Sequence, residues 1–159
     1  MPNHVPNVVS VFGPIDDLLR FQEECFSPKD DGVLALDFNK VIPMPPDVAE
    51  SSSEIAGAMP LWYTWSVENW GTKWNSYQAS NPMFHSPEGV PQAIMSFRFW
   101  TAWSPPIPIY EALKVKYPSL IMDVQYVDEG GGFAGRWSTK EGDVALPCTD
   151  ELRDQLFSA

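Results

Sequence analysis

Two strand–helix–strand patterns, separated by a proline-rich stretch, constrain the fold of this chain more than any other feature of its sequence. In the first pattern, β-branched residues at 7–12 precede apolar residues at helical spacing over 15–26 and an alternating segment at 33–43. In the second, a long β-forming run at 92–103 leads through two prolines into a helix, and two strands around a glycine turn follow. Both patterns predict strands that pack against helices.

Each pattern has the form of the split β-α-β unit of a ferredoxin-like α+β fold. The chain has 159 residues, which fit one domain with a usable core. We predict a single ferredoxin-like domain over 1–159, an antiparallel sheet with helices on one face, a Trp-rich helical insert at about 44–73 and an additional C-terminal hairpin. A short helical turn is predicted at 54–59. The other sheet face is left open, so a chain segment, a ligand or a second copy in a homodimer must cover it.

The formal net charge of −11, from 10 basic and 21 acidic residues, disfavours binding along a double-stranded nucleic acid. It suits a basic partner or mimicry of nucleic acid, and it also suits an acidic surface that contacts only solvent. No apolar run reaches the length of a membrane span, and residues 1–13 lack the basic segment of a secretory signal. We expect a cytoplasmic protein with Cys25 and Cys148 reduced, although a disulfide between them stays open.

Motifs of enzymes and of cofactor sites are weak in this sequence. The series GGGFAG at 130–135 matches a dinucleotide-binding pattern, but strand and turn residues follow it where that motif needs a helix, so we predict a hairpin turn. His4, near a loose chain end, and His85, in a turn, lack the neighbours of a metal site. We expect no cofactor, no metal and no catalysis. Carboxylates remain as candidates for acid–base chemistry: Glu68, Asp123, Asp128 and Glu129.

The tryptophans between residues 65 and 75 give the strongest candidate for a binding surface. In one interpretation the rings line a groove with Glu68 and Lys73 at its rim, since aromatic rings with a few polar groups are typical of ligand pockets and interface hot spots. In the other, the insert folds over the open sheet face and the rings form its core, and Lys73 and Glu68 pair with each other or with Asp128 and Glu129. The candidate surface comprises Trp65, Glu68, Trp70, Lys73, Trp74, Tyr126, Asp128 and Glu129.

Four segments together resemble a known family: the strand–GP–helix start, WYTWSVENWGTKWN at 62–75, FWTAWSPPIPIYEALKVKYP at 99–118 and YVDEGGGFAG at 126–135. The combination of ENWGTKW with TAWSPP is similar to the YubB-type ferredoxin-like domain of plasmid and bacteriophage proteins. The resemblance covers about residues 7–137. It implies a ferredoxin-like fold and a mobile-element origin, and it transfers no catalytic residue.

The main hypothesis is therefore a non-enzymatic phage or mobile-element protein that binds a host macromolecule in the host cytoplasm. A host protein is the expected partner, and the specific hypothesis is that binding interferes with a host defence or regulatory complex. An alternative is a small-molecule or nucleotide-binding module, which could include an enzyme, that uses a Trp-lined groove. Binding of single-stranded nucleic acid on the sheet face is a third hypothesis; it has the aromatic rings but lacks a basic groove.

Overall fold

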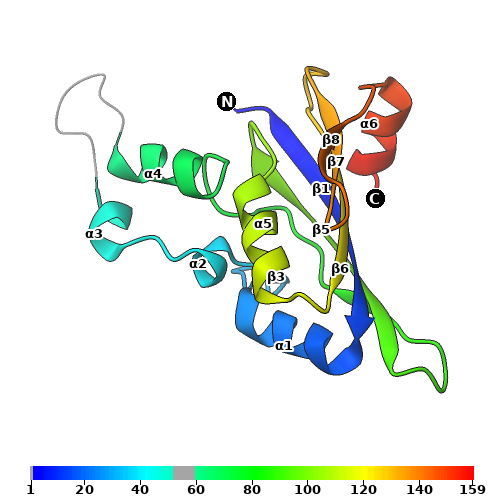
Figure 1. Cartoon of the computed structure of the whole chain (residues 1–159). Coiled ribbons are helices and arrows are strands. Elements are labelled where there is room, and N and C mark those ends of the chain that lie inside the picture. The colour runs from blue at the N-terminus through cyan, green and yellow to red at the C-terminus, as the bar shows by residue number, and fades with distance from the viewer. Residues whose placement is uncertain (1, 52–59) are drawn as a thin grey trace.

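The computed structural model describes residues 2–51 and 60–159, and Figure 1 shows how its helices and strands are arranged. The helical turn predicted at 54–59 lies outside these residues. In chain order the elements are β1 (His4–Pro14), α1 (Ile15–Cys25), β2 (Phe26–Pro28), β3 (Leu34–Leu36), α2 (Phe38–Val41), α3 (Pro46–Ala49), α4 (Leu61–Asn69), β4 (Met83–His85), β5 (Gln92–Ala102), α5 (Ile107–Lys116), β6 (Ile121–Val127), β7 (Ala134–Ser138), β8 (Gly142–Ala145) and α6 (Asp150–Phe157).

The main sheet of the described residues has the strand order β4-β5-β1-β6-β7-β8, and neighbouring strands are antiparallel. The central strand β1 pairs with β5 along its whole length and with β6 over residues 7–12. Strands β1, β4, β5 and β6, together with α1 and α5, form the β-α-β-β-α-β arrangement of a ferredoxin-like fold. Strands β7 and β8 extend it at one edge, so the predicted fold class is confirmed, with its C-terminal hairpin.

The prediction that 33–43 is a strand of this sheet is wrong. Residues 34–36 pair with 26–28 in a separate two-stranded sheet, and α2 begins directly after Asp37. The Asp37 carboxylate accepts a hydrogen bond from the Asn39 amide at 3.0 Å, which caps the helix and ends the strand. The second strand of the first β-α-β unit is β4 instead. Its segment is rich in turn residues, which predict a loop and not a strand.

One face of the sheet packs against α1 and α5. Val9 and Val11 of β1 are fully buried, and so are Leu18 of α1 and Leu113 of α5. Alternating burial along β1, β5 and β6 explains why these strands were recognisable from the apolar pattern alone.

The Trp-rich segment joins the same core. The Phe38 ring contacts the Trp70 ring at 5.7 Å and the Phe99 ring of β5 at 5.8 Å between centroids. Phe99 points to the side of the sheet on which α1 and α5 lie, so this segment extends the helical layer. The interpretation that the insert covers the open sheet face is therefore wrong, although its prediction of a buried Trp core holds for Trp70.

Helix α6 lies on the opposite side of the sheet from α1 and α5 (Figure 1). Its Leu156 packs with Val8, Val127 and other residues at one end of that face. The other end is open, as predicted. There an apolar row crosses the sheet, formed by Ile94 of β5, Phe12 of β1 and Ile121 of β6. These residues are 39%, 39% and 46% exposed, respectively.

The two cysteines are free thiols that lie in different clusters. Cys25 is buried in the core on the α1 side, whereas Cys148 packs beside α6. Burial raises the pKa of the Cys25 thiol. The hydrogen bond with the Tyr117 hydroxyl lowers this pKa, but the effect of burial is larger. Cys25 is therefore a structural thiol of low reactivity.

A buried polar network connects β1, β5 and α5 inside this core. The Asn7 amide nitrogen donates to the Val5 carbonyl and to the Thr101 hydroxyl, each at 3.0 Å. The Asn7 carbonyl oxygen accepts from the Tyr110 hydroxyl at 2.8 Å. Asn7 and Tyr110 are both fully buried, so each group depends on these bonds, and burial raises the pKa of Tyr110 well above its usual value.

Replacing Tyr110 with Phe should reduce the free energy of unfolding by about 1–3 kcal/mol, because the Asn7 oxygen loses its donor while it stays buried. Urea unfolding followed by circular dichroism measures this loss. The double variant Asn7→Leu/Tyr110→Phe should lose less than the sum of the two single variants, since it removes both partners together. Strict additivity would show that the network has no energetic coupling.

Candidate functional site

The loop after α4 and the turn between β5 and α5 are in contact at one end of the sheet, and they carry the motifs ENWGTKW and TAWSPP. The Thr72 hydroxyl donates to the Ala102 carbonyl at 2.8 Å, and the Ser104 hydroxyl donates to the Gly71 carbonyl at 2.5 Å. Gly71 has a φ of +77°, and a Cβ there would lie 2.5 Å from Cδ of Pro108. Glycine is therefore required both for the backbone conformation and for the close approach.

This contact places Lys73 between two tryptophan rings. Its Nζ lies 4.5 Å from the centre of the Trp74 ring and 4.6 Å from that of Trp103, which is the geometry of a double cation–π contact. The rings remain 36% and 40% exposed. Trp103 has a φ of +73°, a costly conformation for a bulky residue, and its amide donates to the Asn3 carbonyl at 2.9 Å.

Further aromatic rings continue from this pair along β5. Tyr77 contacts both Trp74 and Trp100 with ring centroids 6.3 Å apart, and backbone hydrogen bonds join Tyr77 and Trp100 in both directions. His4 lies 4.9 Å from the Trp100 ring and shares a 2.6 Å hydrogen bond with the Tyr77 hydroxyl. Burial, and then the charge of Glu129, raise the pKa of Tyr77 to about 12. The Tyr63 ring of α4 packs edge to face on the Trp103 ring at 5.8 Å between centroids. We call this set the aromatic surface: Tyr63, Lys73, Trp74, Tyr77, Trp100 and Trp103.

Two of the predicted site residues belong to the core and not to a groove. The Trp70 ring is 3% exposed and donates from Nε1 to the Ile42 carbonyl at 2.9 Å. The half-buried Trp65 packs edge to face on it at 5.3 Å. Glu68 is exposed on α4, and within the described residues neither it nor Lys73 forms an ion pair. The predicted pairing of Lys73 with Glu68, Asp128 or Glu129 is wrong, because its ammonium group lies over the Trp74 and Trp103 rings instead.

The predicted acids after β6 have structural contacts. Asp128 is buried and accepts from the Asn3 side chain at 3.3 Å and from the Gly132 amide at 3.0 Å. Glu129 is exposed, and its amide donates to the His4 carbonyl at 3.0 Å. These bonds close the β6–β7 hairpin, as predicted for the GGGFAG series, and tie it to the start of β1. His4 is therefore the first residue of the central strand and does not lie at a loose end.

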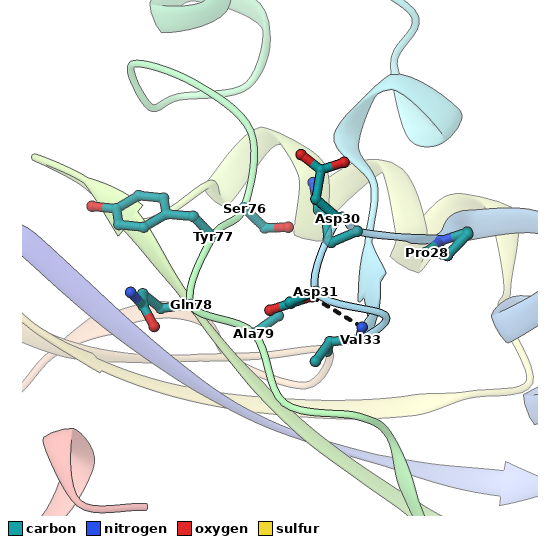
Figure 2. A pocket seen from close by; sticks show the side chains of 9 residues that line it. Pro28, Asp30, Asp31, Val33, Ser76, Tyr77, Gln78 and Ala79 are labelled. Atoms are coloured by element: carbon teal, nitrogen blue, oxygen red, sulfur yellow. Dashed lines mark hydrogen bonds between the residues drawn. The ribbon is translucent and has the colours of Figure 1, made fainter.

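Tyr126 faces a separate pocket, and a second hollow lies beside Tyr77. That hollow has a volume of about 380 Å³ and lies between the 28–33 turn and the 76–79 segment. Figure 2 shows the Tyr77 ring directed away from it, and the Asp31 carboxylate already accepts from the Val33 amide at 3.0 Å. Polar side chains line this hollow, but the Ser76 hydroxyl, like the Asp31 carboxylate, is already hydrogen-bonded within the chain, to the Leu36 carbonyl at 2.5 Å. We therefore take the aromatic surface as the stronger candidate site.

Sequence reasoning selected Lys73 and Trp74 and missed Trp103, Tyr77 and His4. Trp103 follows a strand run and precedes two prolines, which reads as a strand end. One signal in the sequence could have pointed to Trp103. Each of the motifs ENWGTKW and TAWSPP, which carry the family resemblance, contains a Trp near a glycine or proline. Motifs that are both distinctive and both located at element ends are candidates for mutual contact.

Within residues 2–51 and 60–159, no three His, Cys, Asp or Glu side chains are grouped so that they could hold a metal ion. In the same part of the chain, helices that combine the length and the apolar character needed to cross a membrane are absent.

The strand order, the two packed helices and the joined motifs define a ferredoxin-like α+β domain with an aromatic surface at one end of its sheet. The chain belongs to the family described as the ferredoxin-like domain in Api92-like protein, whose model matches residues 69–156. No curated protein and no solved structure matches the chain. The matched region includes TAWSPP, all of ENWGTKW except its first residue Glu68, and the β6–β7 hairpin.

Replacing Lys73 with Met should lower the free energy of unfolding by about 1–2 kcal/mol, because two cation–π contacts are lost while the apolar stem is kept. Urea unfolding followed by Trp fluorescence measures the change. The matched variant Lys114→Met, at an exposed position of α5, should change stability by less than about 0.5 kcal/mol. Equal effects of the two variants would contradict the role of Lys73.

Proposed function

We propose that this protein is a non-enzymatic accessory protein of a phage or related mobile element, and that its aromatic surface binds a host protein in the host cytoplasm. The observation that carries the proposal is the pair of half-exposed rings, Trp74 and Trp103, held on either side of Lys73. Tryptophan is enriched in interface hot spots, and rings fixed before binding lose little conformational entropy when a partner docks. The YubB-type resemblance supports the mobile-element setting.

Charge supports a basic partner. The net charge of −11 attracts positively charged surfaces over several ångströms and raises association rates at low salt. It works against a nucleic acid as the partner. Interference with a host defence or regulatory complex is the biological form we propose, since a small acidic protein can occupy a basic site that the complex needs.

The alternative of a ligand groove among the Trp rings has less support. Trp65 and Trp70 pack on each other, and the Trp70 indole is already hydrogen-bonded to Ile42, so these two rings have little free surface for a ligand. A small-molecule site is better supported near Tyr126, where a pocket exists. That pocket is separate from the proposed protein-binding surface.

The test is affinity purification of the tagged full-length chain from a bacterial host lysate, followed by direct binding of the purified partner. The double variant Trp74→Ala/Trp103→Gly should weaken binding by at least about tenfold. Glycine is chosen at 103 because it accepts a positive φ without strain, so the variant loses the ring and keeps the turn.

The matched control is Phe84→Ala/Val115→Ala, which removes two other exposed apolar side chains. It should leave binding unchanged. Asp128→Lys would not serve as a test of the acidic surface, because Asp128 is buried and hydrogen-bonded within the β6–β7 hairpin. Equal binding by the Trp variant and the control, or no partner under several salt and lysate conditions, would contradict the proposal.

A further inference from the structure

A pocket of about 460 Å³ lies between the start of α5 and the strands β6, β7 and β8. This volume is in the range of small-molecule sites. Its lining is mostly apolar, with proline and isoleucine from the segment before and within α5, Phe133 from the hairpin turn, and Ala134 and Ala145 from the strands. It borders the loop contact at Gly71 and Ser104 and contains none of the rings of the aromatic surface.

The sequence builds this pocket by placing a large side chain opposite a glycine. Tyr126 of β6 pairs with Gly135 of β7, and Gly135 pairs with Ala145 of β8. A Cβ at Gly135 would overlap the Tyr126 hydroxyl, so the Tyr126 ring lies directly over this glycine. The ring thereby reaches across β7, and its hydroxyl donates to Oδ1 of Asp143 on β8.

Among the described residues that line the pocket, Asp143 alone is charged, and it is exposed at the edge of the pocket. The Tyr126 hydroxyl is hydrogen-bonded to Oδ1 of Asp143. The ion pairs within the described residues involve other acids: Asp17, Asp123 and Asp150. Burial, and then the bond with Asp143, raise the pKa of Tyr126, so its hydroxyl stays a donor at neutral pH. The pocket thus combines apolar walls with one carboxylate whose second oxygen has no hydrogen-bond or basic partner within residues 2–51 and 60–159.

We propose that this pocket binds a small organic amine, with its ammonium group on the free oxygen of Asp143 and its apolar stem against Phe133 and Pro108. A cation is selected because the only charge in the lining is negative and the protein as a whole carries a charge of −11. An apolar stem is selected because the inner walls are proline, isoleucine, alanine and aromatic ring surface. A lysine side chain has the same ammonium group and apolar stem, so the test compares a free amine with a peptide that contains lysine.

The probe is hexylamine, titrated into the isotopically labelled full-length protein at 0.15 M salt, with the amide signals of Tyr126, Asp143 and Ala145 followed by NMR. Hexylamine should bind about tenfold more tightly than the neutral hexanol, because only the amine gains a charge-assisted hydrogen bond. A short acetylated peptide with one lysine forms the second arm. Tighter binding of hexylamine assigns the site to free amines; tighter binding of the peptide would overturn that assignment.

Two variants and one control locate the effect. Asp143→Asn keeps an oxygen for the Tyr126 hydroxyl and should reduce hexylamine affinity about tenfold to the level of hexanol. Ala145→Leu fills the pocket and should abolish binding of both compounds. Asp154→Asn makes the same charge change on α6, at the opposite face, and should have no effect. Equal affinity of hexylamine and hexanol, or native binding by Ala145→Leu, would overturn the proposal whether or not a protein partner binds the aromatic surface.

Discussion

The docking of the loop after α4 onto the turn between β5 and α5 is the contact on which the functional end of this protein depends. Gly71 approaches Pro108 without a side chain, and the hydroxyls of Thr72 and Ser104 join the two backbones. This contact divides the Trp-rich segment into two parts. The part before Gly71 turns into the core through Trp70, and the part after it turns outward through Trp74. The same contact forms one side of the pocket beside Tyr126.

The aromatic surface is held in a conformation with a local cost. A tryptophan at a φ of +73° is strained, and such strain costs about 1–3 kcal/mol. The residue before β1 offsets part of this cost, because the Asn3 carbonyl accepts a hydrogen bond from the Trp103 amide. Asn3, directly before β1, and His4, its first residue, also bond to the residues after β6, so the start of the central strand connects the turn after β5 with the β6–β7 hairpin. Retained strain at an exposed pair of rings is consistent with a binding role.

The parts of the fold that could be predicted are those with a strong local pattern. The alternating run at 92–102 and the helix with Ile109 and Leu113 follow from periodicity, since burial on a regular element repeats in sequence. Strand β4 has three exposed residues and therefore no apolar pattern, so it was missed. The candidate site was predicted in part, because sequence cannot show which side of a short helix faces the core. It also cannot show that Lys73 meets Trp103, which lies in a different element.

The most direct test of this division of the Trp-rich segment is the solvent exchange of the indole Nε1 protons, resolved by NMR with single Trp→Phe variants for assignment. The indoles of Trp70 and Trp137 should be strongly protected, because each donates a 2.9 Å hydrogen bond from a buried position. Those of Trp74 and Trp103 should exchange rapidly, because their rings are partly open to solvent. Protection of Trp74 and Trp103 equal to that of Trp70 would contradict the account.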